Sequence, residues 1–163
     1  MAPNKRFIRE PRLNLAQQRA RMIAVWPALD SRIEAGSLVV RGILQPSAIT
    51  RAYRVKLTYR EFGTPKLHII SPKLERRPEA PNVSIPHTYA HATPGEERPC
   101  VYYPLSREWT PAMPLATTVL PWLLAWLVDY ELWFATGEWF GGGMPHGETK
   151  GPNEPRPLAE DAA

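Results

Sequence analysis

The chain has 163 residues, 44% of them hydrophobic, which suits one domain with a packed core and excludes global disorder. The net charge is only +4, and the basic residues near the start carry no interleaved aromatic or groove-reading motif, so we expect no nucleic-acid partner. The lone cysteine, Cys100, excludes an internal disulfide and favours a reducing compartment, so we expect a cytoplasmic protein.

The N-terminal part predicts a short tail followed by a helix. The first residues lack the apolar core of a signal peptide, and we expect residues 1–11 to be a tail before a domain over residues 12–146. Apolar residues at positions 15, 16, 20, 22, 23 and 26 follow helical spacing over residues 13–26. Asn14 can cap the start of this helix, and Pro27 ends it.

Three strand-like segments follow the helix without helices between them. Residues 37–44 are rich in β-branched and apolar side chains, residues 53–59 alternate strictly between apolar and polar, and residues 66–71 follow a turn-like Gly-Thr-Pro. Such spacing predicts an antiparallel meander and, with the helices, an α+β fold. A fourth strand could lie at residues 29–33 or at residues 101–103, and the sequence does not choose between them.

Residues 72–99 predict a long loop, because their many prolines forbid a continuous helix or a central strand. Cys100 stands at the end of this loop. A strongly apolar helix follows at about residues 117–136, with Gly137 as its C-terminal cap. The most apolar stretch, residues 113–128, is shorter than a membrane span, so we expect a buried helix and no membrane partner. Residues 147–163 have the composition of a disordered tail.

The residues around Cys100 indicate a reactive thiol. A lone cysteine is often only a small buried hydrophobe, but this one ends a proline-rich loop and follows His87 and His91 closely. Arg98 and the two histidines could favour the thiolate, which is the nucleophilic form. Either histidine could also donate a hydrogen bond or accept a proton near neutral pH. We therefore treat Cys100, His87 and His91 as the candidate catalytic residues.

The order of these segments resembles that of the ubiquitin-conjugating enzymes, which implies their α+β fold: an N-terminal helix, an antiparallel meander, a catalytic loop and C-terminal helices. In that family a catalytic cysteine is followed at short range by a Trp-Ser-Pro-Ala-Leu segment, and Trp109-Thr110-Pro111-Ala112-Met113 stands in its place here. The family's His-Pro-Asn motif is absent, and Pro86-His87-Thr88-Tyr89 occupies its position. The oxyanion-holding role of that asparagine would therefore pass to His87, His91 or a backbone N–H.

The C-terminal half is similar to a narrower group, the bacterial ubiquitin-conjugating-like proteins of antiphage CBASS systems in their stand-alone form, without a fused activating domain. The similarity rests on the patterns at residues 86–89 and 100–104 and on Trp109, together with the tryptophans, glycines and histidine spaced through residues 121–146. It implies that Cys100 carries the C-terminus of a protein as a thioester, with a cyclic-nucleotide-synthesising enzyme (CD-NTase) as the donor and a lysine or other amine of a target protein as the acceptor. It implies no metal or organic cofactor, and it leaves the separate activating enzyme unknown.

Three other interpretations remain open from the sequence. The protein could be a binding module of the same fold with an idle cysteine, or a Cys-His hydrolase that passes the acyl group to water. It could also bind zinc through His87, His91, Cys100 and His146, although a second cysteine pair is missing. We expect the six tryptophans to lie in the core, with Trp109 bracing the cysteine segment. Several acidic residues could orient an attacking lysine, namely Glu96, Glu97, Asp129 and Glu131.

Overall fold

The structure, a computed structural model, describes residues 11–142 and begins with helix α1, Leu15–Val25. The Asn14 side chain accepts a hydrogen bond from the Gln17 N–H at 2.9 Å, and the Gln17 side chain accepts one from the Asn14 N–H at 3.0 Å. This reciprocal capping box satisfies two donors that the first turn of a helix leaves unpaired. The cap predicted at Asn14 is confirmed. The tails expected at residues 1–11 and 147–163 lie outside the described residues, apart from residue 11, and so does the domain end expected at residue 146.

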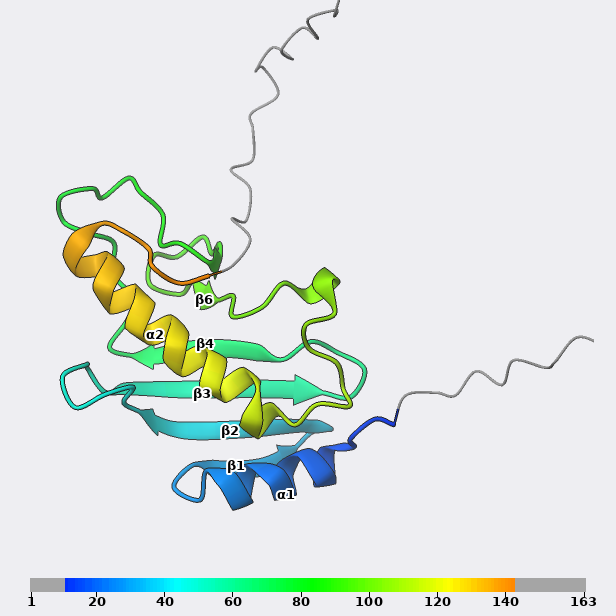
Figure 1. Cartoon of the computed structure of the whole chain (residues 1–163). Helices are drawn as coiled ribbons and strands as arrows, with labels where there is room; N and C mark the ends of the chain where they lie inside the picture. Colours follow the sequence, from blue (N-terminus) through cyan, green and yellow to red (C-terminus); the bar gives the residue numbers. More distant parts are fainter. Residues whose placement is uncertain (1–10, 143–163) are drawn as a thin grey trace, which may run out of the picture.

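Four antiparallel strands form one sheet in the order β1-β2-β3-β4 (Figure 1). The strands are β1 (Asp30–Glu34), β2 (Ser37–Leu44), β3 (Tyr53–Arg60) and β4 (Lys66–Ser71). The predicted meander is confirmed, and the fourth strand is the one that the sequence allowed before residue 37. Residues 101–103, the other possibility, form no strand.

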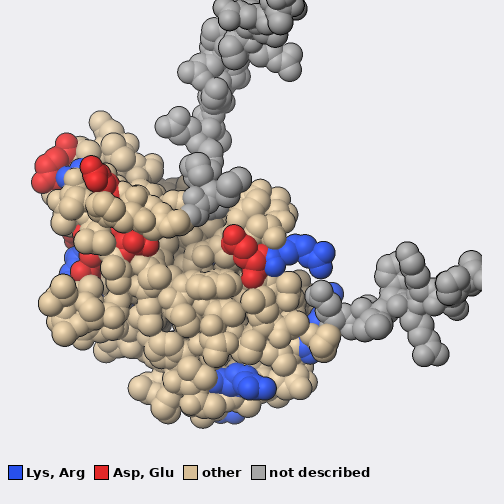
Figure 2. Space-filling model, in the orientation of Figure 1, with Lys and Arg blue, Asp and Glu red and all other residues tan. Residues whose placement is uncertain are grey.

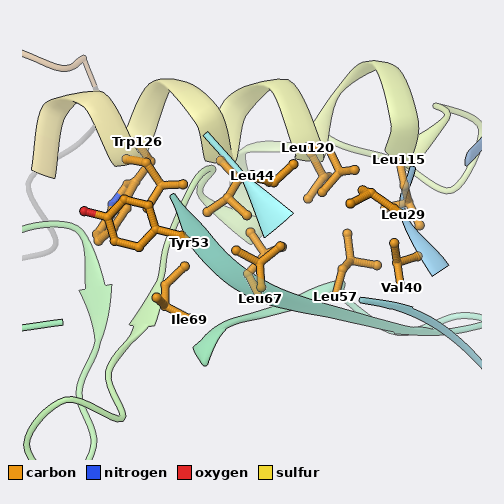
Figure 3. Packing of buried hydrophobic residues seen from close by; sticks show 14 of the residues in the cluster. Leu29, Val40, Leu44, Tyr53, Leu57, Leu67, Ile69, Leu115, Leu120 and Trp126 are labelled. Carbon is orange, nitrogen blue, oxygen red and sulfur yellow. The ribbon is translucent and has the colours of Figure 1, made fainter. Parts of the chain in front are cut away.

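Helix α2, Val119–Thr136, covers one face of this sheet (Figure 3). The alternation in β3 places Tyr53, Val55, Leu57 and Tyr59 on the buried face, where each is at most 2% exposed. From the helix, Leu120, Leu123 and Leu127 meet them and are fully buried. Each such leucine contributes about 1.5–3 kcal/mol through the apolar surface that it removes from water. The core therefore lies between β2–β4 and α2.

Gly137 ends α2 in the left-handed conformation, with φ of +87° and its N–H donating to the Trp133 carbonyl at 2.8 Å. The predicted cap is confirmed, since glycine alone adopts this conformation without strain. The following residues, 138–142, run back along the helix toward the loop region (Figure 1). We expected more than one C-terminal helix, but within residues 11–142 α2 is the only α-helix after the loop.

Residues Leu115–Thr136, which combine the 3₁₀ turn η2 (Leu115–Thr117) with α2, are long and apolar enough to cross a membrane by length and composition. Half of an 18-residue apolar window within this segment is buried inside the protein. The segment is apolar because it packs against the sheet on one side and against the loop on the other.

The loop of residues 72–99 is less irregular than its prolines suggested. Two short strands, β5 (Thr88–Tyr89) and β6 (Arg98–Pro99), pair antiparallel within it. Strand β6 lies beside β4 (Figure 1). The loop is therefore folded back so that residues 87–89 meet residues 98–100. After Cys100 the chain forms the 3₁₀ turn η1, Pro104–Ser106.

Candidate functional site

Cys100 follows β6 directly and is fixed at both its backbone and its side chain. Its N–H donates to the His87 carbonyl at 2.8 Å, and its thiol donates to the Tyr102 carbonyl at 3.2 Å. Only 6% of the residue is exposed. A cysteine at the end of a long proline-rich loop could have an exposed sulfur, but here the pairing of β5 with β6 and residues 101–103 leave the side chain largely buried.

A partly open pocket of about 530 Å³ gives access to Cys100. The pocket lies between the cysteine segment, α2 and the residues after α2. Five aromatic residues are among those that line it, namely Tyr102, Tyr103, Trp122, Trp126 and Trp139. Figure 2 shows the α2 face of the molecule, which is mostly uncharged, with one acidic group near the middle of the view and others toward the upper left. A reactant would therefore approach the sulfur through a mostly aromatic site.

Burial raises the pKa of the Cys100 thiol above its ordinary value. The Tyr89 hydroxyl, a backbone hydrogen bond of Tyr102 and the charge of Arg98 oppose this rise without cancelling it. Arg98 favours the thiolate as predicted, but desolvation is the largest effect, so the pKa of the thiol is raised overall. The thiol is protonated near neutral pH, and its reaction requires a base.

His87 lies in the same pocket as Cys100. Its backbone is left-handed, with φ of +50°, a conformation that histidine tolerates better than most residues. Its carbonyl accepts two hydrogen bonds, from the Cys100 N–H at 2.8 Å and from the Trp126 indole N–H at 2.9 Å. Its ring lies 5.0 Å from the Trp139 ring, centroid to centroid. These contacts bring the imidazole and the sulfur to one cavity.

His91 occupies a different place. It is exposed, and its Nδ1 accepts a hydrogen bond from the Thr93 N–H at 3.1 Å. It does not line the pocket that contains Cys100. The structure thus brings together two of the three candidate catalytic residues and leaves His91 on the loop surface.

Asp129 is the one of the four acidic candidates that reaches this pocket. Burial raises the pKa of its carboxyl, and the nearby His87 lowers it in part. The other three are engaged elsewhere: Glu96 pairs with Lys73, Glu97 with Arg76, and Glu131 accepts from the Tyr53 hydroxyl. The sequence had no means to choose among the four, because their partners come from distant segments.

Several residues of the pocket were not identified from the sequence. Glu108 lines it and accepts a hydrogen bond from the Tyr103 N–H at 3.2 Å. Trp122 and Trp139 line it while only half-buried. The prediction that all six tryptophans lie in the core therefore holds for Trp109, Trp126 and Trp133, which are buried. For the residues on α2 the sequence did contain a signal. Trp122, Trp126 and Asp129 are three to four residues apart, which places them on one side of the helix.

Trp109 lies in the core, 6% exposed, beneath the cysteine segment. Its ring is 5.5 Å from the Tyr59 ring and 6.2 Å from the Tyr102 ring, centroid to centroid. The prediction that it braces this segment is confirmed, because Tyr102 provides the carbonyl that accepts from the thiol.

Within residues 11–142, no group of three His, Cys, Asp or Glu side chains lies close enough together to hold a metal ion. His146, the fourth residue of the zinc hypothesis, lies outside that range.

The helix, the antiparallel meander, the cysteine-bearing loop and the crossing helix together form a ubiquitin-conjugating-like fold. The chain matches the family of type II CBASS E2 proteins over residues 18–147, which is more than half of its length, and it belongs to that family. Its general role is therefore that of a ubiquitin-conjugating-like transferase in CBASS antiphage defence, in association with other CBASS components. No curated protein matches the chain.

Proposed function

We propose that Cys100 carries the C-terminal acyl group of a CD-NTase as a thioester and transfers it to an amine of a target protein. The observation that carries the proposal is the pocket, in which a cysteine, a histidine and a carboxylate meet in a chain of this family. A thiol suits the task because it is both a nucleophile and a good leaving group. We place this reaction in the cytoplasm, where a free thiol persists.

Loading begins with an activated acyl group on the donor's C-terminus. The Cys100 thiol gives its proton to His87, the sulfur bonds to the carbonyl carbon, and the activating group leaves. The raised pKa of the thiol is the reason for this step, since few thiolates are present without a base. His87 is the base that lines the pocket with the sulfur.

In discharge, the neutral amine nitrogen attacks the thioester carbonyl carbon, the carbon–nitrogen bond forms, the carbon–sulfur bond breaks, and the one proton that the nitrogen loses passes through His87 to the Cys100 thiolate. A hydrogen bond to the oxygen of the tetrahedral intermediate would speed this step, and removal of one such donor typically costs about 2.7–4 kcal/mol. The imidazole N–H of His87 suits this role in place of the absent asparagine. Asp129 favours the imidazolium that forms, through its opposite charge.

The test uses the full chain, its CD-NTase and whatever activates the donor. A covalent species should form that hydroxylamine or thiol reductant cleaves, as a thioester requires. Cys100→Ala should abolish it, Cys100→Ser should give a more stable ester, and deletion of the last few donor residues should prevent it. Thermal melts of both variants check that the fold survives. If Cys100→Ala forms conjugates at the wild-type level, the proposal is wrong.

A hydrolase is the second candidate, favoured by the presence of Cys100, His87 and Asp129 in one pocket. It predicts turnover of a model thioester or isopeptide without any acceptor amine. Rapid release of acyl groups to water, with no amide product when amine is present, would support it over the transferase. Tight binding of the CD-NTase with neither activity would instead indicate a binding module.

A further inference from the structure

The sheet has a second face, which points away from helix α2. Side chains alternate between the two faces along a strand, so Arg54, Lys56 and Arg60 lie on the side opposite to the core residues of β3. Helix α2 packs on the core side (Figure 3), and Met22 of α1 joins the same core cluster. We call the other side, formed by β1–β4, the outer face. The proposed transferase chemistry does not use this surface.

The outer face is strongly basic. By the strand register it carries six lysine and arginine side chains and two acidic ones, Asp30 and Glu34. The basic residues are Arg32, Arg41, Arg54, Lys56, Arg60 and Lys66. This excess of positive charge equals the formal net charge of the whole chain, +4. The rest of the chain is therefore neutral on balance, and the outer face is where an anionic partner is attracted.

The β1 side of the outer face is neutralised internally. Arg32 pairs with Asp30 at 2.9 Å, and Arg41 pairs with Glu34 at 3.1 Å. The other four basic side chains belong to β3 and β4, and none of the ion pairs within residues 11–142 includes them. These four residues are the unpaired cations of the outer face.

The four unpaired cations lie in a line along β3. Arg54, Lys56 and Arg60 point the same way from that strand, with a gap at Thr58. Lys66 of β4 lies directly opposite Thr58 and fills the gap. The line is about 20 Å long and has a charge about every 7 Å, as alternate positions of a strand require. Carboxylates on alternate residues of an extended chain have the same spacing, so such a chain can place one against each cation.

The positive potential of this line acts on His68, which lies directly opposite Lys56. Burial lowers the pKa of its imidazole, and the nearby Arg98, Lys56 and Lys66 lower it further, while Glu96 raises it. His68 is therefore neutral near pH 7, and the cations beside it dominate the charge of this part of the outer face.

Two exposed isoleucines flank Arg54 at one end of the line. Ile43 of β2, 60% exposed, is directly opposite it, and Ile70, 40% exposed, lies beside it where the register of β4 shifts. An arginine between apolar side chains is typical of the centre of a protein–protein interface. Single-stranded nucleic acids instead stack their bases on aromatic side chains, and β1–β4 present no Phe, Tyr or Trp on the outer face. These observations favour a protein partner.

We propose that the outer face binds an extended acidic segment of a partner protein, whose carboxylates lie along the four unpaired cations and whose apolar side chain packs between Ile43 and Ile70. The outer face and the Cys100 pocket are on opposite sides of the sheet, so both can be occupied at the same time. The proposal does not depend on the thioester, because it concerns a non-covalent contact away from the sulfur.

Binding can be measured on the full chain with Cys100→Ala, so that no thioester chemistry contributes. The probe is a capped seven-residue peptide with glutamate at alternate positions and valine between them, and its control has glutamine in place of every glutamate. In a ¹H–¹⁵N NMR titration, the glutamate peptide should shift amide signals of β3 and β4, and the glutamine peptide should bind at least tenfold more weakly. Added salt should weaken the glutamate peptide, because it screens exposed charges. Equal binding of the two peptides, or no binding of the glutamate peptide, would overturn the proposal.

Lys56→Glu should weaken binding of the glutamate peptide about tenfold, which corresponds to about 1.4 kcal/mol. Arg21→Glu is the matched control, because it makes the same change in net charge at an exposed position of α1. Thermal melts check that both variants fold. Lys66→Gln, also at an exposed position, should give a smaller loss and keeps the test decisive if Lys56→Glu melts early. Equal weakening by the Lys56 and Arg21 variants would contradict a defined binding face.

Two further probes distinguish a protein partner from other sources of negative charge. They are a single-stranded oligonucleotide of mixed sequence and vesicles of phosphatidylcholine with phosphatidylserine. At equal salt, both should bind more weakly than the glutamate peptide. Tighter binding of either one, lost in Lys56→Glu, would assign the outer face to a nucleic acid or a membrane surface and overturn the proposal. Failure of any thioester to form would contradict the proposed function and leave these titrations unaffected.

Discussion

The two sides of helix α2 contrast in what they bury. Toward the sheet it presents leucines, with Leu120, Leu123 and Leu127 fully buried. Toward the loop it presents Trp122 and Asp129, both half-buried, at the wall of the cysteine pocket. One side is closed by apolar groups alone, and the other keeps polar groups and open volume beside a sulfur. A single helix thus supplies both the stability of the fold and the chemistry of the site, and each side can be changed separately.

The sheet side should give the largest effect on stability. Leu123→Ala removes a fully buried side chain and should lower the free energy of unfolding by about 2–5 kcal/mol, because a cavity remains. Leu132→Ala is the matched control on the same helix, since Leu132 is 42% exposed, and it should change stability little. Urea denaturation measures both. Equal losses would show that the two sides of α2 do not differ as described.

The pocket side should respond in activity and not in stability. His87→Ala should slow discharge of the loaded thioester about 10²-fold, as the loss of a base or an oxyanion donor does. His87→Asn tolerates the left-handed backbone and keeps a hydrogen-bond donor, so partial recovery over alanine would assign the donor role. His91→Ala should discharge near the wild-type rate, because His91 lies outside the pocket. Single-turnover discharge assays measure all three, and a slow His91→Ala variant would contradict this assignment.

Gly141→Ala should have an intermediate effect, confined to the pocket. The added methyl would collide with the Asp129 carboxylate, so we expect discharge to slow by about tenfold through displacement of that group. Gly142→Ala is the comparison, because a Cβ at that position meets nothing within 4 Å, and its effect should be much smaller. Similar rates for the two variants would indicate that the position of Asp129 is unimportant.

The fold was largely predictable because its signals are local. Strict alternation in residues 53–59 defines a half-buried strand, Asn14 with Gln17 defines a helix start, and Gly137 defines a helix end. Each of these patterns depends on neighbours within a few positions. The sheet and both α-helices of residues 11–142 were therefore found at nearly their observed positions.

The site was less predictable because it depends on contacts between distant segments. Prolines in residues 72–99 suggested an open loop, but the pairing of β5 with β6 buries Cys100 and reverses the direction of its pKa shift. Both His87 and His91 were candidates from the sequence, and it is the folded loop that places only His87 in the pocket. Glu108 and Trp139 join the pocket from segments that carry no motif of their own.

The smallest expected effect concerns the reactivity of the resting thiol. Its raised pKa means that the folded protein should react with iodoacetamide more slowly than the urea-unfolded chain at pH 7.5. Because the Tyr89 hydroxyl lowers the pKa of Cys100, Tyr89→Phe should raise that pKa further and slow alkylation by a few-fold. The difference should vanish in urea. Mass spectrometry of timed samples measures the rates, and faster alkylation in the folded state would contradict the burial argument.

The hydrogen bonds of the His87 carbonyl affect the order in which activity and helical structure are lost on heating. This one oxygen receives hydrogen bonds from both the cysteine backbone and an α2 indole, so it links the loop to the helix. Local opening of the loop would break both bonds while leaving the leucine contacts between helix and sheet intact, since proteins open in separate cooperative units. Thermal inactivation should therefore precede the loss of helical circular dichroism, with reversible recovery on cooling.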